Sequence, residues 1–155
     1  MSNPFMQKAI DLALENVTRG RGGPFGAVIV KNGEIIATGV NRVTSTNDPV
    51  AHAEIIAIRA ACKFLDDFQL HGCTLYTSCE PCPMCLGAIY WARLERVYYA
   101  ASRDEAGRVG FDDALIYEEL KAAPAMRAIP MYSLMHDEAQ TVFDAWLRQE
   151  DRISY

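Results

Sequence analysis

Two short segments of the chain contain the residue types that bind metals and transfer protons. The segment at 77–85 (TSCEPCPMC) carries Cys82 and Cys85 three positions apart, where an apolar strand pattern gives way to a helical one. Two thiolates at that spacing can share one metal ion, and the N-terminus of the following helix favours their negative charge. The segment at 48–54 (DPVAHAE) adds His52, a third side chain of a type that zinc accepts. We therefore predict one zinc ion bound by His52, Cys82 and Cys85.

Three protein ligands leave one tetrahedral position of zinc for water, which is typical of catalytic rather than structural sites. Glu54 lies two residues after His52, and its carboxylate can take a proton from that water and deliver it to a leaving amine. Residues i and i+2 of a regular helix do not face the same way. His52 must therefore lie at the very start of a helix, or the longer Glu54 side chain must bend back. This pattern predicts a hydrolytic site with Glu54 as its proton carrier.

Two other metal sites are compatible with the cysteine run. Cys79 could complete a closed, structural zinc site, but Glu54 would then have no role beside the metal. An iron–sulfur cluster is the second alternative, yet the bacterial ferredoxin run requires a further cysteine where Ile89 stands, and it would leave His52 unused. The open zinc site explains more of these residues, and Cys79 is expected in its wall.

The surrounding sequence predicts the elements that must hold the site. Asn3-Pro4 opens a helix, and Asn32-Gly33 joins two strands with the residues that a type I′ hairpin turn requires. Apolar patterns predict strands at 27–30, 34–40, 74–78, 96–100 and 129–134, and helices at 53–64, 83–94, 114–122 and 139–147.

Strands that alternate with helices favour mostly parallel pairing beyond the hairpin. We therefore expect an α/β fold, a three-layer α/β/α arrangement with a five-stranded mixed sheet, in a single domain over residues 1–155. The helix at 83–94 is expected to be largely buried, with Trp91 and Trp146 in the core.

Composition limits the partners and the compartment. The chain has 155 residues with a net charge of −5 and scattered basic residues, which disfavours binding to a nucleic-acid backbone. No apolar run approaches the roughly 20 residues of a membrane span, and the first residues lack the apolar centre of a signal peptide. Three of the five cysteines crowd into seven residues, a poor disulfide framework. We expect a cytoplasmic protein with a small, uncharged substrate and no membrane or nucleic-acid partner.

The two metal-binding segments resemble a known family. H-A-E followed by P-C-x-x-C is the signature of the zinc nucleobase deaminases, whose fold is cytidine-deaminase-like. Within that class the chain is similar to the bacterial guanine deaminases over essentially its whole length, in the stretches GGPFGAVIV, NDPVAHAE, YTSCEPCPMCLGAIYWAR, GFDDALIY and FDAWLRQEDRISY. This resemblance implies hydrolysis of guanine to xanthine and ammonia. It also implies a homodimer whose C-terminal helix and tail, about residues 137–155, are exchanged over the partner's active site.

The resemblance further implies which residues bind the base. Asn41 would hydrogen-bond it, Asp113 would help to recognise guanine, and Tyr155 would help to close the pocket. Phe25 and Ala53 are expected beside the base. Asn41 and Asp113 also have purely structural explanations, as a turn residue and as part of a helix cap.

Three other functions share the metal motifs. A tRNA adenosine deaminase has both segments but needs a basic, phosphate-binding surface. A cytosine deaminase cannot be distinguished by the metal site alone. A structural zinc module would release no ammonia, so zinc content and ammonia release together separate it from the enzymes.

Overall fold

The described part of the chain, residues 3–155 of this computed structural model, opens with helix α1 (Pro4–Thr18). The Asn3 side chain accepts hydrogen bonds from the backbone N–H groups of Phe5 and Met6, each at 3.0 Å. These bonds satisfy two donors that every helix start leaves unpaired. Pro4, which has no N–H to leave unpaired, occupies the first turn. The helix predicted after Asn3-Pro4 is confirmed.

A hairpin follows, formed by β1 (Gly26–Lys31) and β2 (Glu34–Val40). Asn32 and Gly33 connect them with φ angles of 51° and 82°. A type I′ turn requires positive φ at both central residues, which asparagine and glycine tolerate best. The predicted hairpin is therefore confirmed, and it fixes Lys31 opposite Glu34.

Two further strands complete a four-stranded sheet, β3 (Cys73–Cys79) and β4 (Arg96–Ala101), in the order β2-β1-β3-β4. The expectation of mostly parallel pairing is wrong. Only β3 and β4 pair in parallel, whereas β1 is antiparallel to both β2 and β3. Because β2 and β3 are both antiparallel to β1, they run in the same direction, but β1 lies between them.

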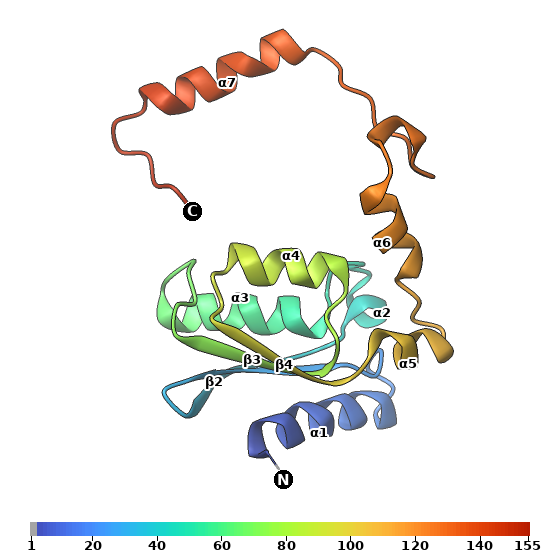
Figure 1. Cartoon of the computed structure of the whole chain (residues 1–155). Coiled ribbons are helices and arrows are strands. Elements are labelled where there is room, and N and C mark those ends of the chain that lie inside the picture. Colours follow the sequence, from blue (N-terminus) through green and yellow to red (C-terminus); the bar gives the residue numbers. More distant parts are fainter. Residues whose placement is uncertain (1–2) are drawn as a thin grey trace. The chain divides into compact units, whose positions relative to one another are not determined.

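The sheet has helices on both faces (Figure 1). Helix α1 packs against β1 and β3 on one face, and α3 (Ala53–Leu65) packs against β2 and β1 on the other, beside α4 (Pro83–Trp91). Small residues allow these layers to approach closely. A Cβ at Gly39 of β2 would overlap the carbonyl oxygen of Ala53, in the first turn of α3. This glycine therefore lets the start of α3 lie directly on the sheet.

The predicted fifth strand at 129–134 is wrong, so the sheet has four strands and not five. Residues 129–134 form no regular element, and Ile129, Met131 and Leu134 are exposed. Pro130 has no N–H to donate to a ladder, which disfavours strand pairing at this position. An apolar run alone does not distinguish a strand from an irregular segment when no neighbouring strand pairs with it.

Short helices occur where the sequence patterns indicated loops. Helix α2 (Val43–Thr46) lies within the expected loop at 41–49, and α5 (Arg103–Arg108) follows β4. Ser102 and Glu105 form a capping box at the start of α5, in which each side chain accepts the other residue's backbone N–H. The Ser-x-x-Glu spacing is a recognised helix-start signal, so α5 was predictable from the sequence.

The chain divides into two compact units, the first of which ends at Asp113 and contains the sheet. The second, Ala114–Tyr155, contains α6 (Ala114–Lys121), a 3₁₀ turn η1 (Pro124–Met126) and α7 (His136–Arg148). Both predicted helices of this region are confirmed. None of the described helices is both long and apolar enough to cross a membrane.

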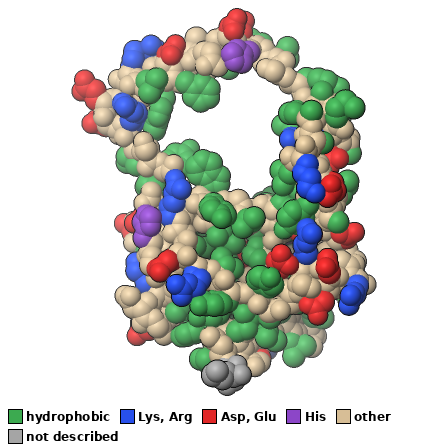
Figure 2. All heavy atoms as spheres, in the orientation of Figure 1, with side chains coloured by type: hydrophobic (Ala, Val, Ile, Leu, Met, Phe, Trp, Pro, Cys, Tyr) green, Lys and Arg blue, Asp and Glu red, His purple; other side chains and the backbone are tan. Residues whose placement is uncertain are grey.

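The expected burial of the two tryptophans is wrong for the single chain. Trp91 at the end of α4 is 63% exposed, and Trp146 in α7 is 40% exposed. Figure 2 shows further hydrophobic side chains exposed along α7, at the top of the view. An isolated amphipathic helix of 13 residues is marginal in water, so its apolar side normally requires a packing partner.

Candidate metal centre

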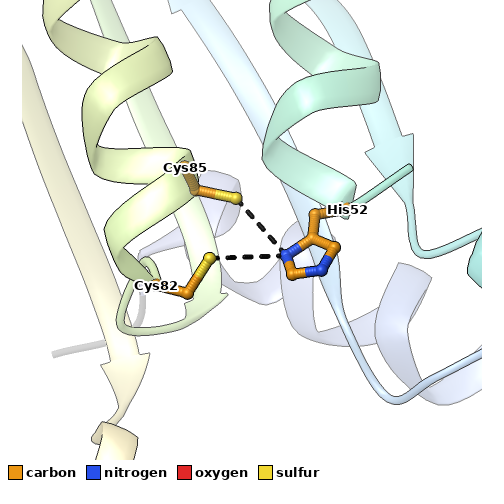
Figure 3. A group of neighbouring side chains, drawn as sticks. All are labelled: His52, Cys82 and Cys85. Atoms are coloured by element: carbon orange, nitrogen blue, oxygen red, sulfur yellow. Dashed lines mark hydrogen bonds between the residues drawn. The ribbon is translucent and has the colours of Figure 1, made fainter. Parts of the chain in front are cut away.

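His52 and Cys82 occupy equivalent positions at the starts of two helices. His52 is the N-cap of α3 and Cys82 the N-cap of α4, both with extended backbone conformations. The two side chains point toward each other from these helix starts (Figure 3). Residues two positions apart on a regular helix face different ways, but His52 precedes the first helical residue of α3. The spacing between His52 and Glu54 therefore does not prevent their side chains from sharing one site.

The three predicted ligands lie together. The Nδ1 atom of His52 is 3.5 Å from the sulfur of Cys82 and 3.5 Å from that of Cys85. In the described part of the chain, they form the group of His, Cys, Asp or Glu residues whose candidate ligand atoms all lie within 4.8 Å of one another. Bonds of about 2.3 Å to sulfur and about 2.05 Å to nitrogen, at tetrahedral angles, place the two ligand atoms about 3.6 Å apart. The donor set and its spacing therefore fit one tetrahedral zinc ion.

A hydrogen bond within the cysteine pair favours negative charge on Cys82. The pKa of the Cys82 thiol is lowered to about 4, chiefly because Cys85 donates a hydrogen bond to it, with further help from His52. The pKa of Cys85 is raised by the same hydrogen bond and by burial, since its side chain is fully enclosed. The shared hydrogen bond therefore lowers the pKa of one thiol and raises that of the other. Because a metal binds thiolates, zinc binding would favour deprotonation of both cysteines.

Cys79 lies outside this group. Its sulfur donates to the carbonyl oxygen of Ser102 at 3.7 Å. Burial, followed by the charge of Glu54, raises the pKa of the Cys79 thiol to about 11. Because the Cys79 sulfur faces a backbone carbonyl and lies outside the group of candidate ligand atoms, the geometry favours the open site over the closed one.

Glu54 lies in the first turn of α3 and is 6% exposed. Burial raises the pKa of its carboxyl group, and the negative charge of Cys82 raises it further. Contact with the Cys85 thiol acts in the opposite direction. A buried carboxyl group beside the metal ligands, with its pKa moved toward neutrality, can both accept and donate a proton.

Asn41 lies at the end of β2 and is 6% exposed. Its Oδ1 accepts the backbone N–H groups of Gly23 and Val43, each at 3.2 Å. Because both partners are donors, they fix the orientation of the amide. The oxygen therefore holds the loop, and the NH₂ group is the part of Asn41 that remains to donate to a ligand.

Three more predicted site residues belong to the same unit. Ala53 is fully buried at the start of α3. Phe25 packs edge-on against Phe111, with ring centroids 4.9 Å apart. The pKa of the Asp113 carboxyl group is raised by burial and then by the charge of Cys82. Tyr155 ends the second unit, and its role at the site stays a prediction.

The sequence patterns missed the residues that connect these parts. Glu80, between Cys79 and the next proline, accepts the backbone N–H of Arg103 at 3.1 Å and donates its own N–H to Ala101. This tie joins the metal-binding loop to the start of α5, the segment that leads to Phe111. An aromatic residue two positions before Asp113 was a visible signal for Phe111, but no spacing rule identified Glu80.

Known proteins support this metal chemistry. The model of the cytidine and deoxycytidylate deaminase zinc-binding region matches residues 2–101, which include all three candidate ligands.

Two proteins from one bacterium show how similar known sequences are. The guanine deaminase of Bacillus subtilis (strain 168) is 54% identical over 151 residues, 97% of each chain. The tRNA-specific adenosine deaminase of the same organism is 42% identical over 115 residues, 74% of this chain and 71% of that one. The crystal structure of guanine deaminase from Bacillus subtilis superimposes with a TM-score of 0.96 at 53% identity, covering 100% of this chain and 99% of that chain.

The ligand assignment predicts how zinc content responds to single substitutions. Wild-type protein and Cys79→Ser should each bind one zinc per chain, because Cys79 faces Ser102. Cys82→Ser and Cys85→Ser should purify with strongly reduced zinc. Metal analysis after exhaustive dialysis measures both, with circular dichroism as the control for folding. A zinc-free Cys79→Ser protein that is still folded would contradict the three-ligand site.

Proposed function

Because the chain belongs to the cytidine and deoxycytidylate deaminase zinc-binding family, we propose that it hydrolyses free guanine to xanthine and ammonia. One observation carries this proposal: a buried carboxyl group, that of Glu54, lies beside a three-ligand His–Cys–Cys group that leaves a coordination position open. The similarity to a guanine deaminase over 97% of both chains supports the choice of base.

The chemistry divides between the metal and the protein. When bound, zinc supplies a water molecule whose pKa is lowered toward neutrality, so that it can attack the carbon bearing the amino group. Glu54 accepts one proton of that water and delivers it to the adjacent ring nitrogen. It then takes the second proton, from the hydroxyl group added to the carbon, and passes it to the leaving amine, which departs as ammonia and leaves Glu54 ionised again. Each transfer requires Glu54 to alternate between its two protonation states, which its raised pKa makes easier near neutral pH.

We assign base binding to the residues around this carboxyl group. The NH₂ group of Asn41 donates to an acceptor of the base, because its oxygen is already engaged by Gly23 and Val43. Asp113 offers an acceptor for the N1–H and 2-amino groups of guanine, which adenine lacks. Phe25, braced by Phe111, and Ala53 provide apolar contacts for the ring.

A tRNA adenosine deaminase is the main alternative, and 42% identity to one shows that the metal motifs are shared. A protein that binds an RNA stem-loop requires basic side chains that contact the phosphates of the RNA backbone. This chain is acidic, with 20 Asp and Glu residues against 15 Lys and Arg. A free base requires no such surface, so the negative net charge of the chain favours free guanine over tRNA as the substrate.

We also propose that the protein acts as a homodimer in the cytoplasm, with the C-terminal helix and tail packed on a second copy. The support for dimerisation is the exposed apolar side of α7, which includes Val142, Phe143 and Leu147, together with exposed Tyr90 and Trp91 on α4. Apolar surfaces of this kind mark interaction sites in soluble proteins. The support for the compartment is that all five cysteines are free thiols.

The substrate assignment predicts the outcome of an ammonia-release assay on guanine, adenine, cytosine and a tRNA anticodon stem-loop. Guanine should be deaminated with the highest kcat/KM, because Asp113 accepts hydrogen bonds from the N1–H and 2-amino groups, which adenine lacks. Preferential release from the stem-loop would instead favour the tRNA enzyme. Zinc-stripped protein serves as the blank.

The proton-carrier assignment predicts the behaviour of Glu54→Gln. This variant keeps the size of the side chain, so it should fold and retain zinc, but turnover of guanine should fall at least ~10²-fold, the scale of a lost general acid and base. Steady-state kinetics and metal analysis on the same preparation measure both. Near-normal turnover would show that protons travel by another route.

The C-terminal assignment predicts that removing residues 150–155 leaves a folded, zinc-loaded protein with sharply reduced guanine turnover. The reason is that a closing segment excludes water and orders the substrate. Kinetics, metal analysis and sedimentation of the full-length and shortened proteins make the comparison. If the shortened enzyme works at the full rate with an unchanged KM, the tail is a dispensable chain end.

A further inference from the structure

Asn16 is a buried polar residue near the end of α1 that the proposed chemistry does not use. Its side chain is 2% exposed. Its Nδ2 donates to the carbonyl oxygens of Gly23 and Asn41, at 2.9 Å in both cases. A single amide thus joins helix α1 to the glycine-rich turn before β1 and to the end of β2.

The same side chain has an acceptor without a partner. Asn16 Oδ1 is buried and makes no hydrogen bond within the described part of the chain. Turning the amide over would not help, because the oxygen would then face two carbonyl oxygens. Leaving a buried acceptor unpaired costs folding free energy. At Asn16 the unpaired oxygen is destabilising, yet both hydrogen bonds donated by the Nδ2 atom are formed.

The two loops that Asn16 joins are also joined to each other. Asn41 Oδ1 accepts the backbone N–H of Gly23, and a Cβ at Gly22 would overlap the carbonyl oxygen of Asn41. Asn16 also lines a pocket of about 180 Å³ together with Arg21 and Arg42.

We propose that Asn16 is a positioning residue for base recognition: it fixes the backbone of Asn41 so that the Asn41 amide meets the substrate in one orientation. The inference rests on the proposed function, since it takes Asn41 as a base-binding residue. Asn16 does not touch the base and acts only through Asn41 and the turn at Gly23.

Two substitutions test the proposal. Asn16→Asp keeps the shape but replaces the donor with an oxygen that faces two carbonyl oxygens, and Asn16→Ala removes the amide. Each should raise the KM for guanine about tenfold, the equivalent of one hydrogen bond, with kcat changed less than about threefold. Zinc content should stay at one per chain.

A double-mutant cycle separates positioning from a general loss of stability. In an Asn41→Ala background, Asn16→Ala should raise KM by less than about twofold, because the group that it positions is already absent. Leu70→Val serves as the control: Leu70 is fully buried just before β3, at the opposite end of that strand from the site. This variant should lower the melting temperature and leave KM unchanged.

The outcomes are distinct. An Asn16 variant with a wild-type KM, or a KM effect that persists fully in the Asn41→Ala background, overturns the positioning role. The cycle is run with whichever base the wild-type protein deaminates fastest, so failure on guanine alone contradicts the substrate assignment and leaves this inference open to the same test. A wild-type protein that deaminates none of the bases overturns both. If Asn16→Asp does not fold, Asn16→Ala decides.

Discussion

The metal centre depends on the common direction of β2 and β3. Both strands are antiparallel to β1, which lies between them, so they end at the same edge of the sheet. Helix α3 follows β2 and helix α4 follows β3, and their N-termini therefore lie near each other, with His52 and Cys82 as the two N-cap residues. These residues are 30 positions apart in sequence, yet only 3.5 Å separates their ligand atoms. The same edge holds the start of β1, so Phe25 and Asn41, which flank the paired residues Gly26 and Val40, lie at this edge as well.

Local electrostatics gives chemically similar side chains in this region different pKa values. Cys82 and Cys85 lie at the start of α4, where the helix dipole and a shared hydrogen bond favour one thiolate. Cys79, three residues earlier at the end of β3, has no such support, and burial keeps it protonated. Glu54 is buried beside negative charge, which raises the pKa of its carboxyl group. One small region thus contains a cysteine whose pKa is lowered, another whose pKa is raised, and a buried carboxyl group whose pKa is also raised.

Much of the site could be predicted from the sequence, because local spacing determines local geometry. Two cysteines three apart at a helix start must share a face, and Asn32-Gly33 has few alternatives to a tight turn. The predictions that were wrong concern features that depend on residues distant in the sequence. The segment at 129–134 is apolar enough for a strand, but pairing requires a neighbour and Pro130 weakens it. The exposure of Trp91 and the hydrogen bonds of Asn16 likewise depend on segments that no local pattern specifies.

Oxygen isotope transfer shows whether water hydrolyses guanine on this protein. Guanine is incubated with zinc-loaded protein in ¹⁸O-labelled water, and the purine product is analysed by mass spectrometry beside xanthine incubated under the same conditions. Hydrolysis should give xanthine with one ¹⁸O atom at the carbon that carried the amino group, and one ammonia released for each xanthine. Xanthine without the label beyond that control, or no conversion by protein with a full zinc complement, would contradict it.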